Sequence, residues 1–564
     1  MARREIGTIW DRKTRNDINE NFKELYNEYI DAGLVAEEAR QKAEEALSRA
    51  NSVQEQLNQV VIDGDSSVEA AQARVDADGN TYNTLKERLD DKETEFSSQL
   101  TQTNEKLNEF QTYNPYLRYG RIELPSYFNP KGIELSRGLD GKVYHNVNLN
   151  FNNLDYDEVL YFDTDEGSKT GGGSKESPYR SMDQCIEHII ASNNRTFKVV
   201  GKGRLFREES INNRTISNKF VYIVGANQDE NLVVSNAQSS TRMGGPNVTT
   251  PPIVWEQYNN IWRAARSATF NVFDLKNKDF YGFGKPLEFG NLEYVESNPN
   301  SFFVDGTYVY VNTFDGRKPD EDILVCLRIE GFKCKLENST LIMENFDFYD
   351  GINPNTSGTV TVLGDIDSKF IGVNLRSAGG NATETVSQTN HVRTNGFQIW
   401  DVGTVMLFEC KTAYNRRDGF NYHYYEIDPT RIKECLVFEY CCVGHESGYK
   451  DDNLTNQIST AHEGVNVLRV GCVGHDMNGP GVQDINDCYT ICIDCNYFDS
   501  KIKTQSSYST AYRFETSGGD GKAVLINCNG DSTWSITGHE NFPVTILNGF
   551  PNYMKIKDVS ITVG

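Results

Sequence analysis

The chain has 564 residues, enough for two or more domains or one long solenoid, and an aromatic content of 11% allows a sizeable buried core. It contains no run of 18 apolar residues, which excludes a transmembrane helix, and its N-terminus lacks the apolar core of a signal peptide. The net charge of −24 argues against nucleic acid or an anionic membrane as a partner, so any anionic ligand would need a local site.

Residues 1–110 are predicted to form an α-helical coiled-coil stalk. After a short amphipathic helix at residues 14–31, apolar residues alternate spacings of three and four over nearly four heptads: Ala36, Ala39, Ala43, Ala46, Ala50, Val53, Leu57 and Val60. Turn-forming motifs rich in aspartate, glycine and asparagine lie at both ends of a small knob at about residues 63–84. A weaker heptad seam follows from Leu85 to Phe110. A single helix lying on a globular domain would need a wider apolar stripe, so the seam favours an oligomeric coiled coil. The alanine-rich seam does not fix the number of helices; we expect three, and therefore a homotrimer.

Residues 111–160 contain three prolines and are expected to be a neck or linker, with a hairpin around residues 138–147. A helix is predicted from Met182 to Ala191, where it would cap the open end of a solenoid. Strands are predicted further along the chain, including residues 269–273, 301–311 and 323–327. The last coil is expected near Leu525 to Cys528, and residues 531–564 are expected to form a C-terminal cap.

The region from Asn395 to Ser500 repeats itself. Four three-residue turn motifs recur at intervals of 23, 29 and 31 residues. Each has a central glycine: Gly396, Gly419, Gly448 and Gly479. Short apolar runs that end in cysteine precede the last three. Irregular, strand-rich units punctuated by glycine or asparagine are typical of the coils of a parallel β-helix. The sequence therefore predicts a mainly β fold, with a right-handed parallel β-helix over residues 161–530.

Eight of the twelve cysteines lie between Cys410 and Cys495, mostly at strand positions. We interpret them as small apolar residues stacked inside the coils of a chain made in a reducing cytoplasm. Cys492 and Cys495 form a CxxC pair, but no second pair completes a zinc site. No metal site is predicted from the cysteines.

Surplus residues in the longer intervals indicate where a site could lie. If about 23 residues close one coil, the surplus falls at residues 421–430 and 450–464, and loops that leave successive coils at one corner lie side by side. We expect these loops to gather one catalytic group: His423, His462, Glu463, Asp418, His445, Glu446, His475 and Asp476. The expected substrate-binding residues are Arg416, Arg417, Asn421, Tyr422, Tyr424 and Gln457.

Such a group could cut a sugar or anionic polymer. A histidine or carboxylate would act as general base, an acid would protonate the leaving oxygen, and an arginine would hold a phosphate or carboxylate. Two carboxylates could instead hydrolyse a glycosidic bond, and the same side chains could hold a divalent cation. The structural alternative is that His445 and His475 only hydrogen-bond in stacked turns, that Asp418 is ordinary turn chemistry and that the arginines form a solvated face.

Several short segments of the sequence resemble segments of known protein families. The segments Asp165–Ser168 and Ser177–Met182 are similar to the opening of pectate-lyase-like right-handed β-helix proteins. Residues 418–423 followed by 459–464 resemble a subset of that fold found in tailspikes and prophage proteins. Residues 6–10 and 66–74 resemble parts of tail-protein stalks from phages of Gram-positive bacteria.

The resemblance implies a homotrimeric tail spike or pre-neck appendage of a virion, made in the host cytoplasm and acting at the host cell surface. It would contact virion tail or neck proteins through the stalk and bind a cell-wall glycopolymer such as teichoic acid, with no nucleic acid and no membrane insertion. Some relatives cut that polymer, so we expect a depolymerase: a phosphodiesterase, glycoside hydrolase or lyase. The familiar carboxylate patterns are not matched in full. The alternatives are a purely adhesive or structural tail protein without enzymatic activity and a prophage-borne polysaccharide lyase.

Overall fold

The computed structural model divides the chain into two compact units, Met1–Gln111 and Thr112–Gly564. It describes residues 42, 49, 51, 84, 86–90, 92, 118–138, 140–206, 214–227, 230–235, 237, 239–240, 252–266, 269–327, 332–349, 358–379, 395–448, 458–498, 510–516, 518–531, 534–539, 542–547, 556–557 and 560–563. The predicted stalk and its knob lie almost wholly outside these residues, although residues 86–90 are helical. The trimeric coiled coil therefore stays a prediction.

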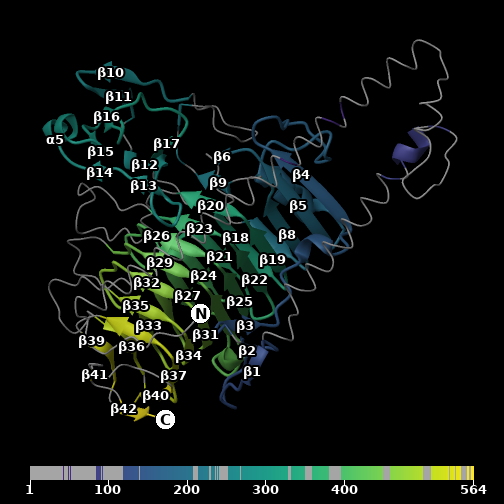
Figure 1. Cartoon of the computed structure of the whole chain (residues 1–564), viewed down its shortest axis with the longest axis vertical. Helices are drawn as coiled ribbons and strands as arrows, with labels where there is room; N and C mark the ends of the chain where they lie inside the picture. The colour runs from purple at the N-terminus through teal and green to yellow at the C-terminus, as the bar shows by residue number, and fades with distance from the viewer. Residues whose placement is uncertain are drawn as a thin grey trace. The chain divides into compact units, whose positions relative to one another are not determined.

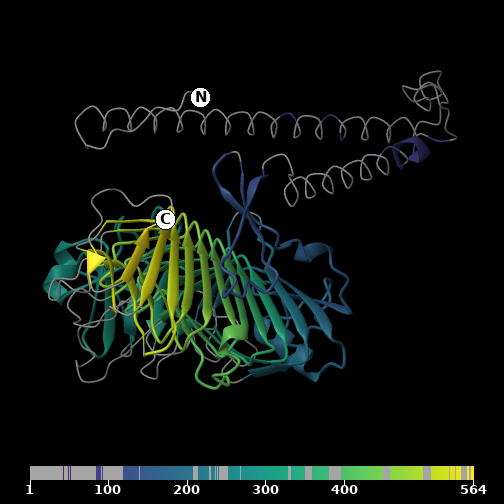
Figure 2. The same ribbon diagram turned by 90° about the horizontal axis from the view of Figure 1, so that it is seen from below.

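From residue 158 onward the chain passes repeatedly through three parallel sheets, and from β18 to β38 each coil adds one strand to each sheet (Figures 1 and 2). The ten-stranded sheet contains β7 (Arg214–Ser217), β18 (Phe332–Glu337), β21 (Gly358–Leu363), β24 (Asn395–Trp400), β27 (Phe420–His423), β30 (Ser459–Ala461), β33 (Val482–Asp484), β36 (Thr510–Phe514), β39 (Trp534–Gly538) and β41 (Ile556–Lys557).

The twelve-stranded sheet comes next in each coil. It contains β4 (Glu158–Asp163), β5 (Thr196–Lys202), β8 (Phe220–Gly225), β19 (Thr340–Glu344), β22 (Lys369–Val373), β25 (Thr404–Phe408), β28 (Leu436–Tyr440), β31 (Asn466–Val470), β34 (Tyr489–Ile493), β37 (Lys522–Ile526), β40 (Pro543–Leu547) and β42 (Ser560–Val563).

The nine-stranded sheet completes the coil. It contains β6 (Leu205–Phe206), β9 (Leu232–Ser235), β20 (Phe346–Tyr349), β23 (Arg376–Ala378), β26 (Lys411–Ala413), β29 (Val443–His445), β32 (Val473–His475), β35 (Asn496–Phe498) and β38 (Asn529–Asp531). The prediction of a mainly β chain with the coils of a parallel β-helix is confirmed. A right-handed course follows from the general rule for parallel crossovers and remains the expectation.

The corner between the twelve-stranded and nine-stranded sheets is made by one residue in the left-handed backbone region. Its φ lies between +48° and +64° in seven successive coils, at Asn345, Asn374, Glu409, Cys441, Gly471, Asp494 and Asn527. Asparagine, aspartate and glycine tolerate this conformation, whereas Glu409 and Cys441 adopt it at a cost. Asn374 Nδ2 also donates to Asn345 Oδ1 at 2.8 Å, so neighbouring corners are bonded to each other.

The interior of the coils is filled by aligned apolar side chains. Phe397 and Phe420, which are register partners, stack with ring centroids 5.2 Å apart. The prediction that cysteines stack inside the coil is confirmed: all twelve are free thiols and eleven are buried, Cys441 being the exception. Five of them follow the same corner of successive coils: Cys410, Cys442, Cys472, Cys495 and Cys528.

A helix closes the first coils, as predicted. Helix α4 (Met182–Ala191) buries Met182, Cys185, Ile186 and Ile189 in the main core. Short 3-10 turns occur at η1 (Phe151–Asn153) and η2 (Ile432–Glu434). Among the described residues, no helix is long and apolar enough to cross a membrane.

The neck is a three-stranded antiparallel sheet of β1 (Arg118–Ile122), β2 (Leu135–Gly138) and β3 (Val143–His145). The expected hairpin is confirmed by the β2–β3 pairing. Phe128, Leu135 and Val143 share an apolar cluster with outward side chains of the twelve-stranded sheet, and Tyr440 Oη donates to Val143 O at 2.7 Å. The neck therefore covers the outer face of that sheet.

Residues 252–327 were expected to belong to the coils, and this prediction is wrong. They form an insertion of antiparallel strands between β9 and β18, because connections of a few residues can join only antiparallel neighbours. The elements are β10 (Glu256–Tyr258), β11 (Ile261–Ala265), β12 (Thr269–Lys278), β13 (Gly284–Pro286), β14 (Glu288–Phe289), α5 (Leu292–Ser297), β15 (Ser301–Val304), β16 (Tyr308–Asn312) and β17 (Ile323–Leu327), with β14 and β15 the one parallel pair described here.

The insertion packs against the outer face of the nine-stranded sheet. Phe283 and Leu324 share one apolar cluster with Tyr349 and Ala378 of that sheet. At the other end, the coil near Leu525 to Cys528 is not the last. β39 to β42 continue the ten-stranded and twelve-stranded sheets through residues expected to form a separate cap.

A fully buried ionic network crosses the interior of the coils. Arg469 donates to Asp484 at 2.7 and 2.9 Å and to Ser459 at 2.9 Å, and its Nε lies 3.6 Å from Glu439. Tyr422 Oη donates to Glu439 at 2.9 Å, which adds an aromatic hydroxyl to the network. Burial raises the pKa of Glu439 to about 7, although the Arg469 charge opposes that shift. The network is tolerated because its charges are hydrogen-bonded to one another.

Replacing Arg469 with methionine should destabilise the fold by about 3–5 kcal/mol, because two carboxylates would stay in the interior without a cation. The matched control is Arg431→Met, which removes the exposed Arg431–Glu434 ion pair and should leave the free energy of unfolding nearly unchanged. Denaturant unfolding of both variants measures the two free energies. Equal losses would contradict the role assigned to the buried network.

Docking of the neck should weaken in acid through His145. Its ring packs 4.9 Å from the Phe408 ring and 4.5 Å from the Tyr440 ring, and burial lowers its pKa to about 4. Since the unfolded residue has a pKa near 6.5, the unfolded state binds the extra proton first, and stability falls as the pH drops through that range.

The linkage relation gives a loss of about 2 kcal/mol at pH 5 from this one group. His145→Phe should remove that part of the pH dependence, as measured by urea unfolding at pH 7.5 and pH 5. The same pH dependence in wild type and His145→Phe would refute this contribution of His145.

Candidate functional site

The two surplus segments leave the coils at different corners, so the prediction of one shared corner is wrong. Residues 424–435 connect β27 of the ten-stranded sheet to β28 of the twelve-stranded sheet. Residues 446–458 connect β29 of the nine-stranded sheet to β30 of the ten-stranded sheet. Asp418-Gly419 leads directly into β27, whereas the next strand described after Ser447-Gly448 is β30, which begins at Ser459. The predicted catalytic residues therefore divide into two groups.

The first group, here called the corner cluster, consists of His423, His462 and Glu463. His423 ends β27, and His462 directly follows β30, the strand paired with β27. The two imidazole rings stack with centroids 3.8 Å apart, and His423 Nδ1 lies 3.5 Å from Glu463 Oε2. The parallel register thus brings together residues that are about 40 positions apart in the chain.

Neighbouring groups hold the corner cluster in place. Tyr424 N donates to Glu463 Oε2 at 2.9 Å, and Thr460 Oγ1 lies 3.2 Å from His462 Nε2. Burial lowers the pKa of His462 to about 2, and the charges of His423 and Arg417 act in the same direction, so His462 is a neutral imidazole. Glu463 has a φ of +63°, a conformation that non-glycine residues adopt at a cost.

Aromatic side chains border the corner cluster. Tyr425 stacks on His423 with centroids 4.7 Å apart and is 61% exposed. Trp400, the register partner of His423, makes edge contacts with both rings. An exposed ring beside imidazoles and a carboxylate is a surface on which a sugar ring can stack.

The second group, here called the hairpin cluster, lies where the β12–β13 hairpin of the insertion meets the nine-stranded sheet. His445 and His475 are register partners whose rings stack 5.3 Å apart. Tyr281 of the hairpin contacts both rings, at 4.9 and 5.6 Å. Phe280 beside it is 93% exposed.

Hydrogen bonds connect three members of the hairpin cluster in series. Tyr281 Oη lies 3.0 Å from His475 Nε2, and His475 Nδ1 lies 2.8 Å from Asp476 Oδ2. If Asp476 accepts from Nδ1, Nε2 is left to accept from the Tyr281 hydroxyl. Burial raises the pKa of Tyr281, and the charges of Asp279 and Asp476 add to this, so the residue is a protonated phenol near neutral pH.

The remaining members of the hairpin cluster are more enclosed. His445 is only 3% exposed and lies 3.4 Å from both Asp279 Oδ2 and Glu446 Oε2. Hydrogen bonding to His445 lowers the pKa of Glu446. Tyr414 Oη donates to Asp279 at 2.8 Å, and Asp279 Oδ1 accepts from the backbone of the hairpin. These contacts fix the hairpin on the sheet.

Four of the predicted site residues are buried away from any polymer, which corrects their assignment. Tyr422 lies inside the coils and bonds to Glu439, and Tyr424 is 3% exposed in the main core. Asn421 donates to Asp418 at 2.8 Å, and both are buried. Strand alternation explains Tyr422, because it puts that ring on the inner face when His423 is on the outer face.

The other substrate-binding predictions are only partly placed. Arg417 is half-buried, and its charge acts on His462 and Tyr425, which locates it beside the corner cluster. Arg416 is also half-buried. Gln457 lies outside the described residues.

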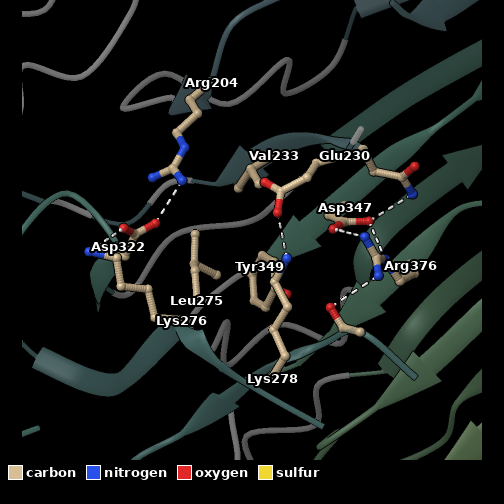
Figure 3. A pocket seen from close by; sticks show the side chains of 12 residues that line it. Arg204, Glu230, Val233, Leu275, Lys276, Lys278, Asp322, Asp347, Tyr349 and Arg376 are labelled. Carbon is tan, nitrogen blue, oxygen red and sulfur yellow. Dashed lines mark hydrogen bonds and ion pairs between the residues drawn. The ribbon is translucent and has the colours of Figure 1, made fainter. Parts of the chain in front are cut away.

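A polar pocket of about 350 Å³ lies between the insertion and the nine-stranded sheet (Figure 3). Each of its four cationic side chains already contacts a carboxylate: Arg204 with Asp322, Lys276 with Asp320, Lys278 with Glu230, and Arg376 with Asp347. Two of these ion pairs, Arg204–Asp322 and Lys278–Glu230, join the insertion to the coils, whereas the other two lie within one of the two parts. The pocket is therefore better explained as a polar junction than as a ligand site.

Sequence reasoning missed Tyr281, Asp279 and Trp400. Tyr281 and His475 are 194 positions apart, and no local pattern around Tyr281 indicates that pairing. Trp400 could have been found, because it stands one coil before His423 at the same position of the repeat. The repeat period predicts such neighbours, whereas the docking of an insertion leaves no periodic signal.

No family model and no curated protein sequence matches the chain. Among solved structures, a glycoside hydrolase has a TM-score of 0.48 at 10% identity, covering 72% of this chain and 95% of that one. The GH136 lacto-N-biosidase from Eubacterium ramulus has a TM-score of 0.35 at 9% identity, covering 72% and 68%. The tailspike protein gp49 from Pseudomonas phage LKA1 has a TM-score of 0.21 at 11% identity, covering 67% and 70%. These proteins are similar to the chain in backbone course alone.

Proposed function

We propose that this protein binds a glycopolymer of the host cell surface and hydrolyses it at the hairpin cluster. The observation that carries the proposal is the series Tyr281–His475–Asp476, with contacts of 3.0 and 2.8 Å. A proton donor, an imidazole and a carboxylate that orients it are the elements of acid–base catalysis. His475 and Asp476 are 16% and 31% exposed, so the series reaches the surface.

The proposed step is protonation of the leaving oxygen by Tyr281. When His475 carries two protons, its Nδ1–H is held by Asp476 and its Nε2–H donates to Tyr281 Oη, which leaves the phenolic hydrogen free for the substrate. As the polymer bond breaks, the phenolic proton moves to the leaving oxygen and the Nε2 proton moves to the phenolate. Water supplies the oxygen of the new bond and releases a proton to solvent, which balances the hydrolysis.

Exposed rings support a sugar polymer as the substrate class. Phe280 projects beside Tyr281, and Phe498 stacks on His475 with centroids 5.3 Å apart. Ring faces bind sugars through apolar contact, while the strongly negative chain disfavours a generic polyanion. A polymer whose anionic groups are spaced by sugars or polyols, such as teichoic acid, is the proposed class.

The place of action is part of the same proposal. A homotrimeric tail spike or appendage is supported by the heptad seam and by residues 6–10 and 66–74, which resemble segments of phage tail-protein stalks. Such a spike would attach to virion tail or neck proteins through the stalk and meet the host cell wall with its coils. It would be made in the host cytoplasm and carried on the virion tail.

Tyr281→Phe removes only the phenolic oxygen and should lower the rate of polymer cleavage by about 100-fold or more, with polymer binding unchanged. Tyr414→Phe is the matched control, because it removes a phenol that bonds to Asp279 and not to His475. Release of fragments from purified wall teichoic acid and other surface polymers measures the rate, and retention on immobilised polymer measures binding.

Equal rates in wild type and Tyr281→Phe would refute the proposed catalytic series. If the wild-type protein binds polymer but releases no fragments, the adhesive alternative is correct. Loss of cleavage in both phenylalanine variants would indicate that the hairpin only needs its packing.

The full-length chain should form a trimer in solution. Light scattering should give three times the chain mass of 63.7 kDa. Replacing Ala43, Ala46 and Ala50 with aspartate puts charges in the predicted seam and should give the mass of one chain. A monomeric wild-type protein would contradict the predicted stalk.

A further inference from the structure

We infer that the corner cluster, His423, His462 and Glu463, is a binding site for a divalent transition-metal ion of the zinc class. One ligand atom from each of the three residues lies within 4.8 Å of the others. The inference concerns a different group of residues from the hairpin cluster and does not depend on the proposed hydrolysis.

The spacing is close to what a metal ion requires. Ligands at 2.0–2.2 Å from a tetrahedral zinc ion are about 3.3 Å apart. His423 Nδ1 and Glu463 Oε2 are already 3.5 Å apart, and the ligand atoms of all three residues lie within 4.8 Å of one another. Because the two rings are stacked, binding of one ion would turn the imidazoles so that a nitrogen of each faces it.

Partners outside the cluster orient its ligands. Thr460 Oγ1 at His462 Nε2 can accept that N–H, which leaves Nδ1 with its lone pair for a metal. The Tyr424 backbone N–H bonds to Glu463 Oε2 and fixes the carboxylate. Hydrogen bonds of this kind to histidine and carboxylate ligands are usual in protein metal sites.

The ring nitrogens of these histidines are used in different ways. Both nitrogens of His475 lie within hydrogen-bond distance of Tyr281 or Asp476, whereas the buried Nε2 of His445 makes no hydrogen bond within the described residues and lies 3.4 Å from the Asp279 carboxylate. In the corner cluster, His423 Nδ1 is buried and accepts or donates no hydrogen bond within the described part of the chain, although the Glu463 carboxylate lies nearby. A cation between His423, His462 and Glu463 would satisfy this nitrogen, and the ligand atoms of these three residues lie within 4.8 Å of one another.

The donor set indicates the kind of metal. Two imidazole nitrogens and one carboxylate suit Zn²⁺ and its neighbours, whereas Ca²⁺ and Mg²⁺ need more oxygen ligands. Three protein ligands leave coordination positions open, as in catalytic zinc sites. His423 and Glu463 are 14% and 22% exposed and lie beside the exposed Tyr425 ring, so an outside group can reach those positions.

The test uses the full-length chain, stripped with a chelator and titrated with Zn²⁺ and Co²⁺ alone. Wild type should bind one ion per chain, with a visible Co²⁺ spectrum of nitrogen and oxygen ligation. Glu463→Gln and His462→Gln should each weaken Zn²⁺ binding by more than about 100-fold, since losing an outer partner alone costs 10–100-fold. The control is His188→Gln, because His188 Nε2 pairs with Glu158 at 2.7 Å and should leave Zn²⁺ binding unchanged.

Thermal unfolding separates loss of the site from loss of the fold. Stripped wild type and stripped Glu463→Gln should melt within a few degrees of each other, and added Zn²⁺ should raise the melting temperature of wild type only. Equal Zn²⁺ affinity in wild type and both cluster variants would overturn the inference, as would equal weakening in His188→Gln. Because no polymer is present, a failed cleavage assay leaves this result unaffected.

Discussion

Strict parallel register between successive coils is the constraint on which the rest of this structure depends. Each strand pairs with the equivalent strand one coil later, so equivalent positions lie directly over one another in all three sheets. The chain uses this alignment for several kinds of side chain. Cysteines and phenylalanines stack inside, asparagines stack at one corner, and histidines stack on two outer edges. A change at one position therefore acts on its neighbours in the coils before and after it.

The same alignment creates two chemically different histidine pairs. His445 and His475 lie under the insertion, where Tyr281 and Asp279 supply hydroxyl and carboxylate partners from outside the coils. His423 and His462 lie at the carboxyl ends of β27 and β30, two central strands of the ten-stranded sheet, where Glu463 and two aromatic rings border them. The partners brought by loops and by the insertion decide what each pair can do. Proton transfer suits the first arrangement and metal binding suits the second.

The repeat of the sequence predicted those features that depend on the coil period. The glycine-containing turn motifs between Gly396 and Gly479 were enough to identify the coils, and strand alternation placed the cysteines inside. The meeting of His423 with His462 also follows from register, even though the expected shared corner was wrong. The repeat did not indicate that Tyr422 bonds inside to Glu439, because an ionic network in a β-helix interior breaks the apolar pattern. The docking of Tyr281 depends on a separate antiparallel insertion that the repeat cannot encode.

The most direct measurement of the central claim is the structure of the full-length protein with a fragment of the wall polymer bound. The account predicts a sugar unit against Phe280, with the bond to be cleaved placed so that its leaving oxygen lies within hydrogen-bond distance of Tyr281 Oη. Fragments bound only at surfaces remote from the β12–β13 hairpin would contradict it, and hydrolysis would then have to be assigned to another part of the molecule.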